Sequence, residues 1–141
     1  MSVFQNSEQI YETVGELMDR AKKDPEVGPK IAKSRIIIQF HYTEPEAVTT
    51  VNAQDTPTQE GAFVDVFHGE CSLKPHVVMS MKADTAHRFW LGKVNLVSAL
   101  AKGEIEDVGP IPKILKLLPA VKPLYSMYPD LLREKGHADL V

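Results

Sequence analysis

The side chains best able to do chemistry in this 141-residue chain are five histidines and one cysteine. A metal site on a helix needs two ligands one turn apart on the same face. The histidines never lie three to five residues apart, so this arrangement is absent. Scattered surface or core histidines are a simpler interpretation than a metal site assembled from separate strands. The five are His41, His68, His76, His87 and His137. No metal ligand is assigned.

The segment from His68 to Cys71 comes closest to a catalytic cluster. A histidine beside a thiol can lower the thiol pKa and create a nucleophile. Gly69, however, is typical of a turn between strands, and no third residue is identifiable that would orient the histidine. A hairpin connection is therefore the preferred interpretation of this segment.

Acidic side chains are a second potential source of acid–base chemistry. Glu44 with Glu46, and Glu104 with Glu106 and Asp107, could supply paired carboxylates. Acids that alternate along a strand or loop are more typical of a solvated face. The phosphate-binding turns GxGxxG and GxxxxGK, the zinc motif HExxH and the nucleophile elbow GxSxG are all missing. We assign no catalytic residue and no cofactor.

The composition predicts one soluble domain over residues 1–141. The chain is 43% hydrophobic, and its 16 basic and 19 acidic side chains give a formal net charge of −3. A nucleic-acid partner is not expected, since such a protein shows a basic face. One cysteine, no secretory signal and no apolar run long enough to span a bilayer predict a cytoplasmic location.

Periodicity predicts a helix followed by four strands. Asn6 and Gln9 have the spacing of a capping box, and the apolar stripe behind them continues to Ala21. The short connections between the strands predict an antiparallel meander, because a parallel crossover needs a dozen or more residues. The expected strands are residues 34–42, 47–54, 62–68 and 76–82.

The pattern then returns to helices. Asp84 is expected to cap one that Gly92 ends, and Asn95 to cap another that Gly103 ends. Residues 104–108 are a short candidate fifth strand. Helices grouped against one antiparallel sheet make an α+β domain.

An apolar surplus follows, from Ile111 to Leu132. It exceeds what one amphipathic stripe requires, so core, subunit interface and the wall of an apolar cavity are three competing explanations. Pro119, Pro123 and Pro129 each remove a backbone donor and are expected to break or kink the helix, which favours short pieces that could form a movable lid.

Several features between residues 77 and 109 keep the order and spacing of one known family. They are the strand at 77–81, the helix start Asp84-Thr85, Phe89, the pair Gly92-Lys93, Ala99, Gly103 and Gly109. On these residues the chain resembles the sterol carrier protein type-two (sterol-binding domain) family of small lipid-binding domains. The absence of a peroxisomal targeting tail points to a stand-alone, bacterial-type member.

The resemblance implies a five-stranded, mostly antiparallel sheet with helices packed on one face, enclosing an apolar tunnel. It implies non-catalytic binding or transfer of a fatty acid, an acyl chain or a sterol-like lipid. The alternative is an enzyme that uses the same cavity, with His68, His87 or Tyr125 as acid or base. Transient membrane contact and a homodimer stay open as partners. The expected ligand-binding residues are Phe89, Trp90, Leu96, Val97, Leu100, Ile105, Ile114, Leu115, Leu118, Val121 and Tyr125.

Overall fold

A computed structural model describes residues 2–141. Its first elements form a continuous helical stretch made of α1 (Ser7–Ile10), the π-helical η1 (Tyr11–Gly15) and α2 (Glu16–Lys23). The predicted cap is confirmed, because the Asn6 side chain accepts a hydrogen bond from the Gln9 backbone N–H at 2.9 Å. The predicted stripe is also confirmed, and its residues are all buried: Ile10, Val14, Leu17, Met18 and Ala21. α3 (Val27–Ala32) follows.

The five strands form one mixed sheet in the order β3-β2-β1-β4-β5. All neighbouring strands are antiparallel except the central pair, β1 and β4, which is parallel. The α+β class and the mostly antiparallel sheet are therefore confirmed. The strands are β1 (Ile37–Thr43), β2 (Ala47–Asn52), β3 (Asp65–His68), β4 (Val77–Lys82) and β5 (Ile105–Val108).

The prediction of a simple meander was wrong for β4. After β3, residues 69–76 lead the chain back, and the His76 backbone N–H donates to the Ile37 carbonyl at 2.9 Å. β4 thereby pairs with β1 instead of β3. The connection between the two parallel strands comprises β2, β3 and their loops, which is longer than the dozen residues that a crossover needs.

Helices α4 (Ala83–Trp90) and α5 (Leu96–Lys102) follow β4. The Asn95 cap is confirmed by its bond from the Ser98 backbone N–H at 2.9 Å. The Asp84 cap was wrong, because α4 follows β4 directly and begins two residues earlier than expected, with Lys82 at the cap position. Asp84 instead accepts bonds from the Ser2 hydroxyl at 2.7 Å and the Val3 backbone N–H at 3.0 Å.

Two of the motif glycines have clear structural reasons. Gly103 ends α5 with φ at 75°, a left-handed conformation that side chains disfavour. Gly109 has φ at 123°, and a Cβ there would lie 2.4 Å from the His76 carbonyl oxygen. Because glycine has no Cβ, the end of β5 can pass close to the start of β4.

The C-terminal segment consists of several helices, as the prolines predict. They are α6 (Ile111–Leu115), α7 (Leu118–Val121), α8 (Leu124–Glu134) and the 3-10 turn η2 (Ala138–Leu140). One expectation was wrong, because Pro129 lies inside α8 without ending it.

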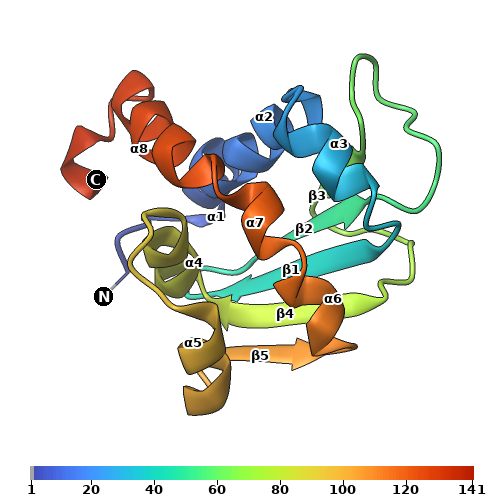
Figure 1. Cartoon of the computed structure of the whole chain (residues 1–141). Coiled ribbons are helices and arrows are strands. Elements are labelled where there is room, and N and C mark those ends of the chain that lie inside the picture. The colour runs from blue at the N-terminus through green and yellow to red at the C-terminus, as the bar shows by residue number, and fades with distance from the viewer. Residues whose placement is uncertain (1) are drawn as a thin grey trace.

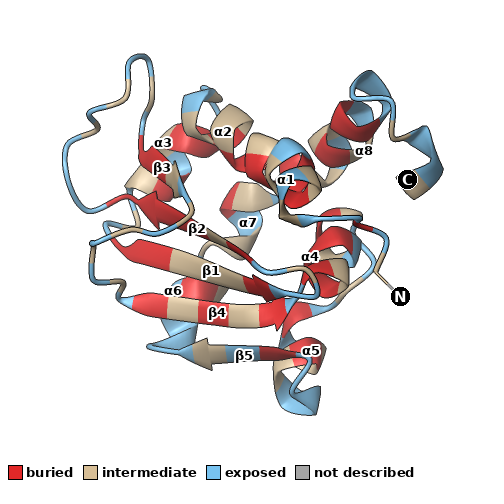
Figure 2. Cartoon of the chain, turned by 180° about the vertical axis from the view of Figure 1, so that it is seen from behind, coloured by how far each residue is buried: buried red, intermediate tan, exposed pale blue. Residues whose placement is uncertain are grey.

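The main helical layer covers one face of the sheet. Figure 1 shows α1, α2, α3, α7 and α8 on the same side of the strands, with α4 beside them. Seen from behind in Figure 2, β1, β4 and β5 have no helix lying over them. The hydrophobic core fills the space between the sheet and the helices, and this is where an apolar site would lie.

Candidate functional site

An apolar cavity of about 80 Å³ lies between the sheet, α4 and the α6–α7 segment. No charged side chain is among the described residues that line it. The lining residues are Ile38, Phe40, Tyr42, Met79, Met81, Ala86, Phe89, Trp90, Leu96, Ile105, Ile114, Leu117, Leu118 and Val121.

Alternate residues of three strands form the floor of this cavity. Side chains two apart on a strand point to the same face. In the sheet register Phe40 is opposite Met79, Tyr42 is opposite Met81, and Met81 is opposite Ile105. The pairing of β1 with β4 therefore joins residues far apart in sequence into one surface.

Helices supply the roof. α4 contributes Phe89 and Trp90, whose rings meet edge to face with centroids 4.8 Å apart. Tyr125 at the start of α8 extends this aromatic cluster, since its ring centroid lies 5.7 Å from that of Phe89. Burial raises the pKa of Tyr125. α6 and α7 complete the roof with their inward apolar side chains.

Seven of the eleven predicted ligand-binding residues line the cavity. They are Phe89, Trp90, Leu96, Ile105, Ile114, Leu118 and Val121. Tyr125 lies instead at an adjoining hollow, and Leu100 and Leu115 pack against the core outside the cavity lining. Val97 is 59% exposed, because Leu96 turns inward and the next helical residue points about 100° away from it.

The remaining lining residues were not predicted as ligand-binding. They are Ile38, Phe40, Tyr42, Met79, Met81, Ala86 and Leu117. Alternation in the segments 34–42 and 76–82 was a usable signal for the strand residues, since it identifies a buried face. It does not tell which end of that face borders a cavity.

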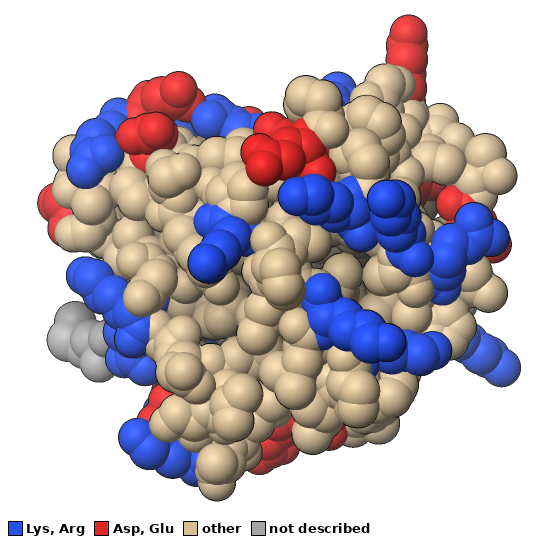
Figure 3. Space-filling model, in the orientation of Figure 1, with Lys and Arg blue, Asp and Glu red and all other residues tan. Residues whose placement is uncertain are grey.

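A shallower hollow adjoins the cavity and shares Phe89, Leu96 and Leu118 with it. Its other lining residues include Asn95, Lys122 and Tyr125, so polar groups occur here and the hollow forms a candidate mouth. On the face shown in Figure 3, Lys and Arg side chains are spread across the middle, and acidic side chains lie in the upper part and at the edges.

His87 is buried on α4 outside the cavity lining. Its Nε2–H donates to the Leu140 carbonyl at 2.9 Å, which fixes the tautomer and leaves Nδ1 to accept from the Tyr128 hydroxyl at 2.7 Å. Burial lowers the pKa of His87, so the neutral ring is favoured. This histidine connects α4 to α8 and the C-terminal turn.

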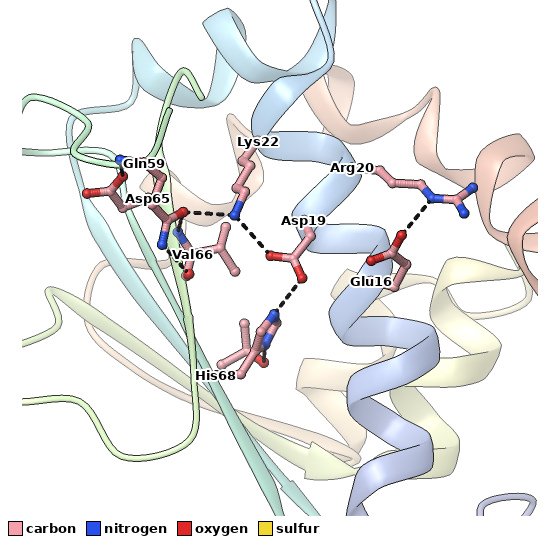
Figure 4. Close-up of polar contacts among 9 residues, drawn as sticks. Glu16, Asp19, Arg20, Lys22, Gln59, Asp65, Val66 and His68 are labelled. Atoms are coloured by element: carbon pink, nitrogen blue, oxygen red, sulfur yellow. Dashed lines mark hydrogen bonds and ion pairs between the residues drawn. The ribbon is translucent and has the colours of Figure 1, made fainter. Parts of the chain in front are cut away.

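His68 is held between α2 and the sheet (Figure 4). Its Nε2 lies 2.9 Å from Asp19 and its Nδ1 lies 3.1 Å from the Thr49 hydroxyl. Burial opposes ionisation of Asp19, but contacts with His68 and Lys22 outweigh it and lower the pKa of the carboxyl. Thr49 is only 1% exposed and is not among the residues that line the cavity. His68 pairs with these groups instead of with Cys71. The hairpin interpretation of the segment from His68 to Cys71 was wrong, because β4 pairs with β1 and not with β3.

Lys22 extends this network to the loop before β3. Its ammonium lies 3.3 Å from Asp19 and donates to the Gln59 side chain at 2.9 Å. Gln59 in turn bonds both backbone groups of Val66 on β3. The network fastens α2 to the sheet edge and does not reach the cavity lining.

Among residues 2–141, no three His, Cys, Asp or Glu side chains are grouped closely enough to hold a metal ion. No helix in the same range combines the length and hydrophobicity needed to cross a bilayer.

No family model and no curated protein matches the sequence, whereas several solved structures resemble the fold. Apo sterol carrier protein 2 from Yarrowia lipolytica is 14% identical with a TM-score of 0.57, covering 84% of this chain and 87% of that one. Sterol carrier protein domain 2 of Helicoverpa armigera is 19% identical with a TM-score of 0.60, covering 82% and 89%.

A third neighbour is a solution structure of palmitated SCP2L2 from Aedes aegypti. It is 17% identical with a TM-score of 0.55, and the match covers 78% of this chain and 95% of that one. The matches extend over most of each chain and agree with the element order described above. The chain therefore has the sterol carrier protein fold, as the motif between residues 77 and 109 implied.

Proposed function

We propose that this protein binds and transfers a hydrophobic small molecule, such as a fatty acid, an acyl chain or a sterol-like lipid, without catalysing a reaction. The observation that carries the proposal is the cavity between the sheet and α6–α7, whose described lining residues include no charged side chain. The palmitated state of the Aedes aegypti neighbour supports an acyl chain as ligand.

Desolvation would drive this binding. At about 0.8 kcal/mol per buried methylene, a dozen methylenes give a gross gain on the order of 10 kcal/mol. Loss of free motion offsets part of it, so micromolar affinity, near −8 kcal/mol, is a reasonable ceiling. Such binding tolerates varied chains, and broad specificity follows.

The size of the cavity implies that the roof moves. An apolar cavity of about 150 Å³ accommodates one benzene molecule, whereas this one measures about 80 Å³. A long chain therefore needs α6 and α7 to shift outward. These helices have five and four residues and no side-chain cap, and such short pieces lose few backbone bonds when they move.

A carrier is favoured over an enzyme by the positions of the histidines. His68 pairs with Asp19 and Thr49, and His87 pairs with Tyr128 and Leu140. Neither lines the cavity. An enzyme would instead show turnover that collapses on replacing one histidine while ligand affinity persists.

Native mass spectrometry of freshly purified protein tests the proposal, because a carrier should retain unchanged lipid. Leu118→Asp should lower chain affinity at least tenfold, since it buries a carboxylate in the apolar wall. Lys116→Asp is the matched control, because Lys116 is exposed on the same segment outside the lining. Equal affinity in the two variants would contradict the proposed site.

We also propose transient contact with an anionic membrane near the mouth. From Val108 to Pro129 the chain contains Lys113, Lys116 and Lys122 and no acidic residue. All three lysines are exposed, and each such residue near an anionic bilayer contributes about 1 kcal/mol. Co-sedimentation with phosphatidylserine vesicles should exceed that with phosphatidylcholine vesicles and fall with added salt.

A further inference from the structure

The Tyr42 hydroxyl takes no part in holding the fold. Tyr42 on β1 lines the cavity and is only 4% exposed. Its hydroxyl has no hydrogen-bond partner among residues 2–141, whereas the buried hydroxyl of Tyr128 is paired with His87. The indole N–H of Trp90 is the one other side-chain nitrogen or oxygen among the described lining residues, and it too has no hydrogen-bond partner among residues 2–141.

The unpaired hydroxyl must border open space. Within the described chain, no side-chain nitrogen or oxygen is both sealed from the surroundings and without a partner. Tyr42 is otherwise buried and lines the cavity, and on this basis we assign the space beside its hydroxyl to the cavity. Phenylalanine would fill the same position without leaving a polar group unpaired, which costs free energy in an apolar site.

The surroundings determine which ligand group suits this hydroxyl. Burial raises the pKa of Tyr42, so the hydroxyl keeps its proton and can donate a hydrogen bond. No Lys, Arg or His is among the described lining residues. A carboxylate placed here would be desolvated without a counter-charge, which is far costlier than burying a neutral oxygen.

We propose that the cavity takes an alkyl chain bearing a neutral oxygen, an alcohol or a carbonyl, with that oxygen inside and hydrogen-bonded to the Tyr42 hydroxyl. This inference rests on the proposed lipid-binding function and adds the chemical class and orientation of the ligand. A fatty acid binds in the opposite sense, with its carboxylate at the mouth, where Lys122 lies.

The test compares 1-octanol with nonane, in which a methyl group replaces the hydroxyl, and with octanoate. The chain has one tryptophan, Trp90, and it lines the cavity, so its fluorescence reports binding. Tyr42→Phe should weaken 1-octanol about fivefold, as expected for one hydrogen bond, and leave nonane and octanoate within twofold. Equal changes for 1-octanol and nonane, or none for either, overturn the inference.

Tyr128→Phe is the control, because its hydroxyl is paired and lies outside the lining. It should lower the melting temperature and leave the 1-octanol to nonane ratio unchanged. Tyr42→Phe should keep or raise the melting temperature of the free protein, and a loss as large as that of Tyr128→Phe overturns the inference. If no probe binds the unaltered protein, the proposed function itself fails, whereas nonane binding without the Tyr42 effect refutes this inference alone.

Discussion

The C-terminal helices use the same kinds of apolar residue in two different ways. In α8, Leu124, Leu131 and Leu132 are fully buried against the core. In the α6–α7 segment, Leu117 between the two helices and Leu118 at the start of α7 remain partly exposed and line a cavity. Apolar content alone therefore does not decide whether a segment fills the core or encloses space.

Helix length explains the difference. α8 continues for eleven residues and presents a regular ridge to the neighbouring helices, whereas α6 and α7 contain five and four residues. Pro112 and Pro119 lie in the first turns of the short helices, and Pro123 separates α7 from α8. Short pieces cannot align many side chains into one groove, so packing beneath them is incomplete.

The largest expected effect compares two leucine truncations. Leu131→Ala should lower the free energy of unfolding by about 3 kcal/mol, because it opens a new cavity in close-packed core. Leu118→Ala should cost about 1 kcal/mol, since its side chain already borders open space. Urea unfolding measures both. Equal losses would show that the two regions are packed alike.

Enlarging a buried alanine to leucine tests the same difference between the close-packed core and the cavity. Ala21 and Ala86 are both buried, but only Ala86 lines the cavity. Ala21→Leu should destabilise the protein by about 1–3 kcal/mol through overpacking. Ala86→Leu should leave stability unchanged or higher and weaken ligand binding at least tenfold, because it occupies the cavity. Thermal unfolding and Trp90 fluorescence check the pair, and a comparable loss of stability in both would refute the contrast.

The smallest expected effect depends on pH and concerns the packed region. The pKa of His87 is about 6.5 in the unfolded chain and lower in the folded one, so the unfolded state takes up the proton first. The stability that the neutral His87 ring contributes to the folded protein is complete above pH 6.5, and it is lost as the pH falls through the folded-state pKa of His87. Between pH 7.5 and 5.5 the free energy of unfolding should fall by up to about 1 kcal/mol.

His87→Gln provides the control, measured by urea unfolding at both pH values. The fall should be smaller in this variant than in the unaltered protein. Identical pH dependence would show that protonation of His87 does not oppose folding.

Local signals in the sequence predicted much of the fold. The Asn6 and Asn95 caps and the Gly103 ending depend on contacts within a few residues, so their spacing was sufficient. The Asp84 cap failed because the direct passage from β4 into α4 moved the helix start. The prediction that Pro129 ends the helix failed because the packing of α8 keeps the helix continuous despite one missing backbone donor.

The chain alone determined where helices and strands form, where prolines interrupt them and where apolar residues accumulate, because these depend on neighbours in sequence. Only the tertiary structure decided that β4 pairs with β1 and that Tyr42 meets a cavity roofed by α6 and α7. Strand partners and voids depend on how distant segments pack together, and residue spacing carries little information about that.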